Sequence, residues 1–219
     1  MESVYIIGAS GFALEITEYL KADTSYEVSG YFDPNKDDYD RNDFKAPYLN
    51  SEKDFDFQEG SNVIISIADP KIKNRIYTDL KDRGLRFPAV ISKQTFIGAN
   101  SKIGEGAIIC PFVTITSNAI IGTIFHANIY SYVAHDCVIG NNVTFAPAVK
   151  CNGNVIIEDN VYIGTGAIIF QGKPGKPLII GENSVIAAGS VVTKSVPKNT
   201  TVFGNPAIEF TKENINKRK

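Results

Sequence analysis

The sequence predicts a mixed fold, in which a small N-terminal α/β domain of the Rossmann-like kind precedes a parallel β-helix of six-residue repeats. Two observations predict it. Short apolar runs alternate with helical spacing over the first 90 residues, and from residue 97 onward an apolar side chain returns at every sixth position, with one insertion after residue 169. The 219 residues therefore divide into an α/β domain over 1–90, a repeat domain over 91–208 and a C-terminal tail over 209–219.

Composition and charge exclude several other classes of protein. Lys and Arg number 22 against 24 Asp and Glu, so the formal net charge of −2 gives no electrostatic basis for binding nucleic acid or an anionic membrane. No apolar run is long enough to span a membrane. The N-terminus has neither a basic leader nor the apolar run of an export signal, so a cytoplasmic location is expected. Three cysteines without a C-x-x-C pair and only two histidines predict neither a disulfide framework nor a metal site.

The first 90 residues contain strands and helices in alternation. Apolar runs predict strands over 4–7, 28–32 and 63–67, and helical spacing predicts helices over 12–20 and 71–83. Asp33-Pro34 ends the second strand, and Gly84 ends the second helix. This order is typical of a βαβ unit with a parallel sheet.

The loop Gly8-Ala9-Ser10-Gly11 joins the first strand to the first helix. Its backbone N–H groups and the helix N-terminus suit a phosphate, although a tight strand-to-helix turn needs the same glycines. The dinucleotide fingerprint G-x-G-x-x-G is incomplete, because Ser10 replaces its second glycine. Asp33 either accepts a hydrogen bond from a sugar hydroxyl or starts an Asp-Pro turn. We therefore expect a nucleotide or nucleotide sugar here, and redox chemistry is disfavoured.

The repeats predict the shape of the second domain. The leading positions are Ile97, Ile103, Ile109, Ile115, Ile121, Ala127, Val133, Ile139, Phe145, Cys151, Ile157, Ile163, Ile169, Ile180, Ile186 and Val192. The residue four places after a leader is usually small or β-branched, so it shares one face of a short strand with the next leader. The third residue after a leader is Asn, Gly or Asp in 11 of the 16 repeats, and these types tolerate positive φ. Flat strands with sharp corners stack into a solenoid of three-sided coils.

The six-residue period closely resembles that of the hexapeptide-repeat acyltransferases. The order of GASGFALEI, the YFD strand end, SIADPKIKNRI, AHDCVIG and the closing VFGNPA narrows this resemblance, which extends over residues 3–207 or so. It is similar to the subgroup of sialic acid O-acetyltransferases and nucleotide-4-amino-sugar N-acetyltransferases of bacterial glycan synthesis. The resemblance implies a left-handed β-helix, acetyl-CoA as co-substrate, no metal and a homotrimer. The period alone leaves the handedness open.

His135 lies two residues after a leader, on a corner where packing does not require an imidazole. Histidine, with a usual pKa of about 6.5, can accept the proton of a sugar amine or hydroxyl that attacks a thioester. The resemblance implies that His135 is the catalytic base and that Asp136 raises its basicity. Asp136 also occupies a slot that positive-φ residues fill in any case, so a purely structural role stays open for it.

The resemblance implies further site residues. The acetyl-CoA contacts would be Thr144, Thr165 and Ala188, and the nucleotide-sugar contacts would be Ser10, Gly11, Phe12, Asp33 and Ala68. This chain has Thr144 and Phe12 where some relatives carry a histidine, and Ala68 where they carry a glycine.

Several other residues receive expectations from the repeat register. An insertion over residues 171–177 should project from a corner, where Lys173 and Lys176 either meet CoA phosphates or belong to a solvated loop. His126 should face outward as a surface or interface residue. Cys137 and Cys151 occupy inward slots and should be core thiols rather than nucleophiles.

These observations predict an acetyl-CoA-dependent N-acetyltransferase that acts on a nucleotide-linked amino sugar of the 4-amino-4,6-dideoxy type. His135 would serve as general base while the amine attacks the thioester directly. Two alternatives stay open. The acceptor is a hydroxyl of sialic acid or another sugar, or the chain is a non-catalytic β-helix that binds sugars. The repeat does not separate amine from hydroxyl acceptors, because both need one base and one thioester.

Overall fold

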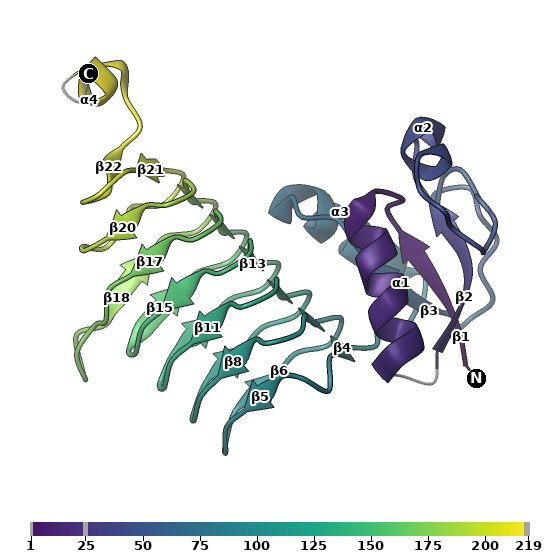
Figure 1. The fold of residues 1–219 in the computed structure, drawn as a ribbon, viewed down its shortest axis with the longest axis horizontal. Coiled ribbons are helices and arrows are strands. Elements are labelled where there is room, and N and C mark those ends of the chain that lie inside the picture. The colour runs from purple at the N-terminus through teal and green to yellow at the C-terminus, as the bar shows by residue number, and fades with distance from the viewer. Residues whose placement is uncertain (1, 24–25, 217–219) are drawn as a thin grey trace.

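A computed structural model describes residues 2–23 and 26–216, and Figure 1 shows its two parts side by side. The N-terminal part is a three-stranded parallel sheet in the order β2-β1-β3 with three helices. Its elements are β1 (Glu2–Ile7), α1 (Gly11–Asp23), β2 (Tyr26–Phe32), α2 (Lys36–Asp40), β3 (Asn62–Ile65) and α3 (Pro70–Asp82). Over the described ranges, no helix is long and apolar enough to span a bilayer.

The helices begin where local hydrogen bonding requires. The Asp69 side chain caps α3 by accepting from the N–H groups of Lys71 and Ile72, both at 2.9 Å, and Pro70 occupies the first turn, where no N–H partner is needed. The one-turn helix α2 was not predicted, because it buries none of its residues and so leaves no apolar periodicity.

The rest of the chain winds into a left-handed parallel β-helix of hexapeptide repeats, whose strands form three sheets. The first sheet contains β4 (Val90–Ile91), β7 (Ile108–Ile109), β10 (His126–Ala127), β13 (Thr144–Phe145), β16 (Tyr162–Ile163), β19 (Val185–Ile186), β21 (Thr201–Phe203) and β22 (Ile208–Glu209). The second contains β5 (Phe96–Ile97), β8 (Thr114–Ile115), β11 (Tyr132–Val133), β14 (Lys150–Cys151), β17 (Ile168–Ile169) and β20 (Val191–Val192). The third contains β6 (Lys102–Ile103), β9 (Ile120–Ile121), β12 (Val138–Ile139), β15 (Val155–Ile157) and β18 (Leu178–Ile180).

The chain passes from the first sheet to the second, then to the third and back to the first. We name the three bends the first–second, second–third and third–first corners. Only β22 pairs antiparallel among the described strands. A short helix, α4 (Lys212–Asn216), follows within the predicted tail, and residues 217–219 of that tail lie outside the described residues.

The interior of the coil confirms the repeat register. From Ile109 to Val192 every leading side chain is buried, and the residues four places after the leaders fill the same interior. Each large aliphatic side chain buried in this way contributes about 1.5–3 kcal/mol. Ile97 is 36% exposed, because it belongs to the lowest coil, and Ile103 beside it is partly buried.

Most corners of the coil adopt the left-handed backbone conformation that the repeat predicts. The Asn, Asp and Gly corner positions have positive φ, except Gly172, where the chain leaves the coil for the insertion. The same conformation occurs at Phe112, Ile124, Tyr130 and Ala148, with φ between 52° and 62°. For a β-branched residue such as Ile124 this costs roughly 1–2 kcal/mol. The stacked coils thus impose the corner even where the residue type disfavours it.

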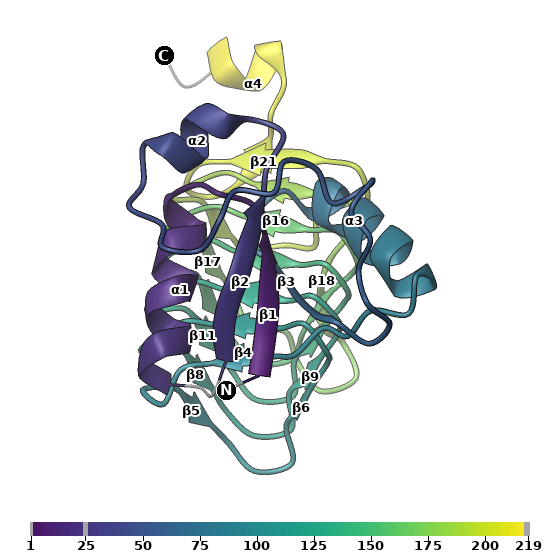
Figure 2. The same cartoon turned by 90° about the vertical axis from the view of Figure 1, so that its right-hand side faces the viewer.

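The N-terminal domain packs on the first sheet of the coil, as Figure 2 shows from the domain side. Lys73 of α3 is fully buried at this contact, and its Nζ donates to the carbonyl oxygens of Ile124 at 3.0 Å and Val143 at 3.1 Å. Tyr77 Oη donates to Glu105 at 2.7 Å one helical turn further along. The domain and the lower coils therefore share one core.

His126 faces outward from the coil and lies at an interface, which is one of the two positions expected for it. The N-terminal domain covers it and leaves 2% of it exposed. The Phe12 ring lies 5.9 Å away between centroids, and both imidazole nitrogens are buried without a hydrogen bond of ordinary geometry. Burial, and next the charge of Lys73, hold the pKa of His126 well below its usual value, against an opposing effect of the Ile65 backbone.

We expect His126→Phe to reduce the acid sensitivity of folding. The unfolded chain binds a proton at this histidine near pH ~6.5, whereas the folded protein keeps the imidazole neutral. The folded state then binds fewer protons, so the free energy of unfolding falls by about 1.4 kcal/mol per pH unit below that point. Urea unfolding at about pH 7.5 and 5.5 measures the slope. Equal slopes in the wild type and the variant would contradict this origin of acid sensitivity.

Candidate active site

His135 lies on the second–third corner between β11 and β12, with 59% of its side chain exposed. Its Nδ1 is 2.7 Å from Oδ2 of Asp136. An ionised carboxylate only accepts hydrogen bonds, so Nδ1 carries the hydrogen and donates it. The lone pair of Nε2 is then available in the neutral ring. The geometry is that of a proton acceptor held in one tautomer at the rim of the coil.

Asp136 occupies the left-handed corner position and also contacts the imidazole of His135. Its φ of 58° makes it the left-handed residue of the corner. Its Oδ1 accepts from Nδ2 of Asn118 at 3.1 Å, and Asn118 lies 18 residues earlier, directly below on the same corner. The hydrogen bonds from His135 and then Asn118 lower the pKa of the Asp136 carboxyl. Asp136 therefore remains a carboxylate at neutral pH, next to the imidazole.

Gly153, which the sequence analysis missed, determines where the imidazole lies. It occupies the next coil above His135, and a Cβ atom at Gly153 would lie 2.8 Å from Cε1 and Nε2 of the His135 ring. The ring thus lies against the glycine, where any side chain would push it away. The only sequence signal was a glycine 18 residues after the histidine, the spacing that stacks residues on one corner.

We expect Gly153→Ala to lower kcat roughly 10–100-fold, because the new methyl group displaces Nε2 from its present position. The clash involves the end of an exposed side chain, so the fold accommodates it and the thermal midpoint should change by no more than a few degrees. Steady-state thiol release together with a thermal scan measures both effects. Unchanged kcat would show that this ring position is not the productive one.

The predicted nucleotide-sugar residues gather at one edge of the N-terminal sheet. The strands are parallel, so the loops after β1, β2 and β3 share their carboxyl edge. These loops carry or adjoin Ser10, Gly11, Phe12, Asp33 and Ala68. The helices α1 and α3 both begin at this edge, so their N-terminal N–H groups give it positive potential.

Asp33 joins the loops at this edge. Its Oδ2 accepts from the N–H of Ala9 and its Oδ1 from the N–H of Asn35, both at 2.9 Å. Gly8 has a φ of 105°, and a Cβ there would lie 2.4 Å from Oγ of Ser66, so only glycine fits. Asp33 therefore fixes the shape of the loop whether or not a sugar hydroxyl also binds to it.

The predicted acetyl-CoA contacts lie away from His135 within one chain. Thr144 is on the first sheet and 4% exposed, and its hydroxyl donates to the carbonyl of Ala68 at 2.8 Å. Thr165 and Ala188 are exposed on the first–second corner, in successive coils. The structure thus brings Thr144 to the nucleotide-sugar edge, but it does not bring these three residues to the corner of His135.

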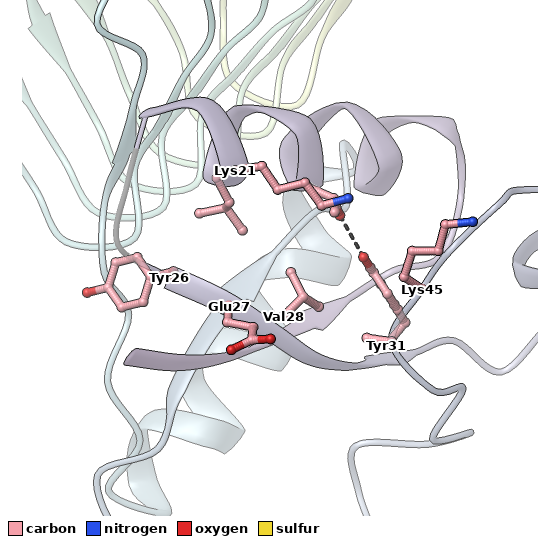
Figure 3. A pocket seen from close by; sticks show the side chains of 9 residues that line it. Lys21, Tyr26, Glu27, Val28, Tyr31 and Lys45 are labelled. Atoms are coloured by element: carbon pink, nitrogen blue, oxygen red, sulfur yellow. Dashed lines mark hydrogen bonds between the residues drawn. The ribbon is translucent and has the colours of Figure 1, made fainter. Parts of the chain in front are cut away.

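Several pockets lie at the N-terminal domain, and two of them differ in how they relate to the predicted site. One, of about 420 Å³, lies where the start of α3 meets β16 and β19, between Lys71 and Tyr162. The other, of about 360 Å³, lies between α1 and β2 (Figure 3), and contains none of the predicted site residues. A hydrogen bond of 2.7 Å between Thr17 Oγ1 and Tyr31 Oη crosses from one element to the other there. The first pocket adjoins the nucleotide-sugar edge.

The cysteines are core residues, as the register predicts. Cys137 and Cys151 are both fully buried inside the coil. The contact with Cys137, followed by burial, raises the pKa of the Cys151 thiol well above its usual value. Neither thiol is placed to act as a nucleophile. Within the described ranges, no group of three His, Cys, Asp or Glu side chains is arranged to hold a metal ion.

Two known protein families match this chain, one in each of its two domains. Residues 3–80 match the PglD N-terminal domain, and residues 154–194 match the hexapeptide repeat of succinyl-transferase. The chain is 51% identical over 166 residues to GDP-perosamine N-acetyltransferase of Escherichia coli O157:H7, covering 76% of this chain and 71% of that protein. It is 34% identical over 131 residues to galactoside O-acetyltransferase of Lactococcus lactis, covering 49% and 61%.

Solved structures share the whole architecture. WeeI from Acinetobacter baumannii AYE is 43% identical with a TM-score of 0.83, and the match covers 96% of this chain and 100% of that one. PerB from Caulobacter crescentus, solved in complex with CoA and GDP-perosamine, is 23% identical with a TM-score of 0.85, covering 96% and 98%. At that identity the second match concerns the fold.

Proposed function

The chain belongs to the hexapeptide-repeat acetyltransferases with a PglD-type N-terminal domain, and from this premise we propose that it N-acetylates a nucleotide-linked amino sugar. The donor is acetyl-CoA and the acceptor is the amino group of a 4-amino-4,6-dideoxy sugar, in bacterial glycan synthesis. The observation that carries the chemistry is the exposed His135, with Nδ1 bound to Asp136. The amine acceptor is supported by the 51% identity to an N-acetyltransferase, against 34% to an O-acetyltransferase.

The reaction needs one base and no covalent enzyme intermediate. The neutral sugar amine attacks the carbonyl carbon of the thioester and forms the C–N bond, while Nε2 of His135 accepts a proton from the nitrogen. The C–S bond then breaks, and the imidazolium returns the proton to the leaving CoA thiolate. Asp136 orients the ring and stabilises its protonated form. Proximity provides much of the rate, and backbone N–H groups near the corner stabilise the oxyanion.

The nucleotide would bind at the carboxyl edge of the N-terminal sheet. Ser10, Gly11 and Phe12 begin α1 and would face the phosphates, and Asp33 and Ala68 would border the sugar. Asp33 already holds the N–H of Ala9, so its first role is to shape the loop. A cytoplasmic location suits an enzyme whose two substrates are a nucleotide sugar and acetyl-CoA.

The active site would form between neighbouring subunits of a homotrimer. The N-terminal domain packs on the first sheet, whereas His135 lies on the opposite corner, so a sugar held by one chain would meet the histidine of another. Acetyl-CoA would lie between that corner and the Thr165 corner of the neighbour. The outward faces of Ile120 and Val138, 50% and 40% exposed, form part of an aliphatic stripe on the third sheet that suits contact with a second copy.

An acetyl-transfer assay tests this function. The acceptors are GDP-, UDP- and dTDP-linked 4-amino sugars, each paired with its 4-hydroxy counterpart, plus free sialic acid, and thiol release is followed. We expect release with an amino sugar and none with its hydroxyl counterpart. Release with sialic acid or a hydroxyl sugar alone would replace the proposal by O-acetylation. A chain that neither releases thiol nor binds CoA would be a sugar-binding β-helix, and the proposal would fall.

A further inference from the structure

Two aromatic rings project from the first–second corner at positions where the repeat otherwise favours Asn, Gly or Asp. Phe112 and Tyr130 have φ values of 62° and 60°, which residues with a large side chain rarely adopt. The two residues are 49% and 54% exposed, so burial offsets little of this conformational cost. Their rings stack in successive coils, with centroids 5.1 Å apart and 9° between planes. Neither burial nor backbone preference explains aromatic residues at these two positions, whereas contact with a ligand would.

The ring of Tyr130 has one free face. Phe112 stacks against the face that is directed to the coil below, because it occupies the same corner 18 residues earlier. In the coil above, this corner position is Ala148, and the next two are Gly166 and Gly189. Ala148 contributes only a methyl group, and a Cβ at either glycine would meet no other part of the chain within 4 Å. These three positions leave the corner above Tyr130 clear of bulky side chains, so the ring forms a platform with open space over it.

This platform lies at the height of the His135 imidazole. Tyr130 and His135 flank β11 in one coil, and Ala148 and Gly153 flank β14 in the coil above. The His135 ring leans toward Gly153, since a Cβ there would lie 2.8 Å from Nε2. The coil that leaves space over the platform is therefore the same coil that leaves space for Nε2.

The platform and the imidazole stand on different corners of one chain, so they face each other only between chains. In the proposed homotrimer, the His135 corner of one subunit lies against the first–second corner of its neighbour. When the coils run parallel to the threefold axis, the rotation keeps every residue at its own height. His135 then faces Tyr130 of the partner subunit across the space that Ala148 and Gly153 leave.

We propose that the acceptor sugar lies on the free ring face of Tyr130 of the partner subunit while His135 accepts the proton of its amine. A 4-amino-4,6-dideoxy hexose carries a methyl group at C6 in place of a hydroxymethyl group. It therefore presents more apolar surface to an aromatic face than a 6-hydroxy sugar does. Tyr130 thus selects 6-deoxy acceptors and sets the height of the amino nitrogen. The inference rests on the proposed function and adds a specificity-determining residue to it.

Tyr130→Asn is the test variant, because asparagine occupies the same left-handed corner conformation at Asn100 and Asn118. We expect the KM for the nucleotide-linked amino sugar to rise roughly tenfold, with the Kd of CoA unchanged. The thermal midpoint should equal or exceed that of the wild type, because asparagine suits this backbone better than tyrosine. Tyr130→Phe keeps the ring and should restore most of the lost affinity for the sugar.

Phe112→Asn is the matched control, because it makes the same kind of change in the same backbone conformation one coil lower. Its ring lies beneath Tyr130 and does not meet the sugar, so KM should rise less than in Tyr130→Asn. The acceptors are a 4-amino-4,6-dideoxy hexose and its 6-hydroxy counterpart on the same nucleotide. The wild-type preference for the dideoxy sugar should shrink in Tyr130→Asn and persist in Phe112→Asn.

Mixed assemblies test whether the platform and the base come from different chains. His135→Ala chains are co-expressed with Tyr130→Asn chains, and the mixed trimers are isolated. A site with both wild-type residues then forms only where the histidine of one chain meets the tyrosine of the other. We expect thiol release with the wild-type KM to return in these trimers. Mixed trimers that show only the raised KM of Tyr130→Asn would overturn the placement across the subunit boundary.

The remaining outcomes separate this inference from the proposed function. If the wild type acetylates an amino sugar and Tyr130→Asn has an unchanged KM, the platform is wrong and the proposed function stands. If Tyr130→Asn binds CoA more weakly while the KM for the sugar is unchanged, the ring belongs to the donor site, which also overturns the inference. A wild type that releases thiol with no amino sugar overturns the proposed function, and the inference with it.

Discussion

His135→Ala is expected to lower kcat by about 10²–10⁴-fold while CoA remains bound. The alanine removes the proposed base, and the described corner offers no second imidazole, since His126 is buried beneath the N-terminal domain. The thioester is already activated, so proximity should preserve a residual rate. Thiol release under saturating substrates gives kcat, and calorimetry with CoA gives Kd. Near-normal turnover would remove His135 from the mechanism.

The matched variant for this experiment is Asp136→Asn. Asparagine occupies the same left-handed corner position at Asn100 and Asn118, so it keeps the backbone and removes only the charge. We expect kcat to fall by less than for His135→Ala, with an unchanged thermal midpoint, because the amide oxygen still accepts from Nδ1 but no longer carries the negative charge that stabilises the imidazolium. A fall in the midpoint with normal kcat would instead assign Asp136 to the corner alone.

The repeat domain was predictable from the sequence because each coil repeats one local solution. A leader such as Ile139 is buried, and a corner such as Asn118 is left-handed, for reasons contained in six residues. The corners at Phe112 and Tyr130 were not predictable from residue type. Their rings stack at 5.1 Å with 9° between planes, but what forces the backbone is the coil above and below them.

In the candidate site too, some residues were predictable from the repeat register and others depend on contacts between distant parts of the chain. His135 and Asp136 were predictable because the register alone places them on a corner, pointing outward. Gly153 acts on the ring only through the stacking of coils, and no local pattern distinguishes it from other corner glycines. The burial of His126 depends on how the domain packs against the coil, a contact between residues distant in sequence. Single-sequence periodicity carries no information on such docking.

Lys73 is the residue of that docking surface whose removal should cost most. It is fully buried, and burial holds the pKa of its amine well below the usual value, against the opposing charge of Asp69. Its Nζ donates to the carbonyls of Ile124 and Val143. These acceptors lie 51 and 70 residues away in sequence, so the side chain ties α3 to two successive coils.

We expect Lys73→Ala to lower the free energy of unfolding by about 3 kcal/mol, because it leaves a cavity and a buried carbonyl without its donor. Lys73→Met fills most of the volume, so it should cost about half as much and isolates the lost hydrogen bonds. Urea unfolding measures both. If Lys73→Ala and Lys73→Met lower the free energy of unfolding by the same amount, the cavity left by alanine contributes nothing, and the predicted difference between the two variants is wrong.

The alkaline side of the stability profile provides an independent check on the charge state of Lys73. The unfolded chain holds its proton up to a pKa of about 10.4, whereas the folded amine releases it at a lower pH. Between these two values the unfolded state binds more protons, so the wild-type free energy of unfolding rises with pH. Lys73→Met removes the group and should remove this rise. A rise of equal size in Lys73→Met would mean that the buried amine keeps its proton over this range of pH.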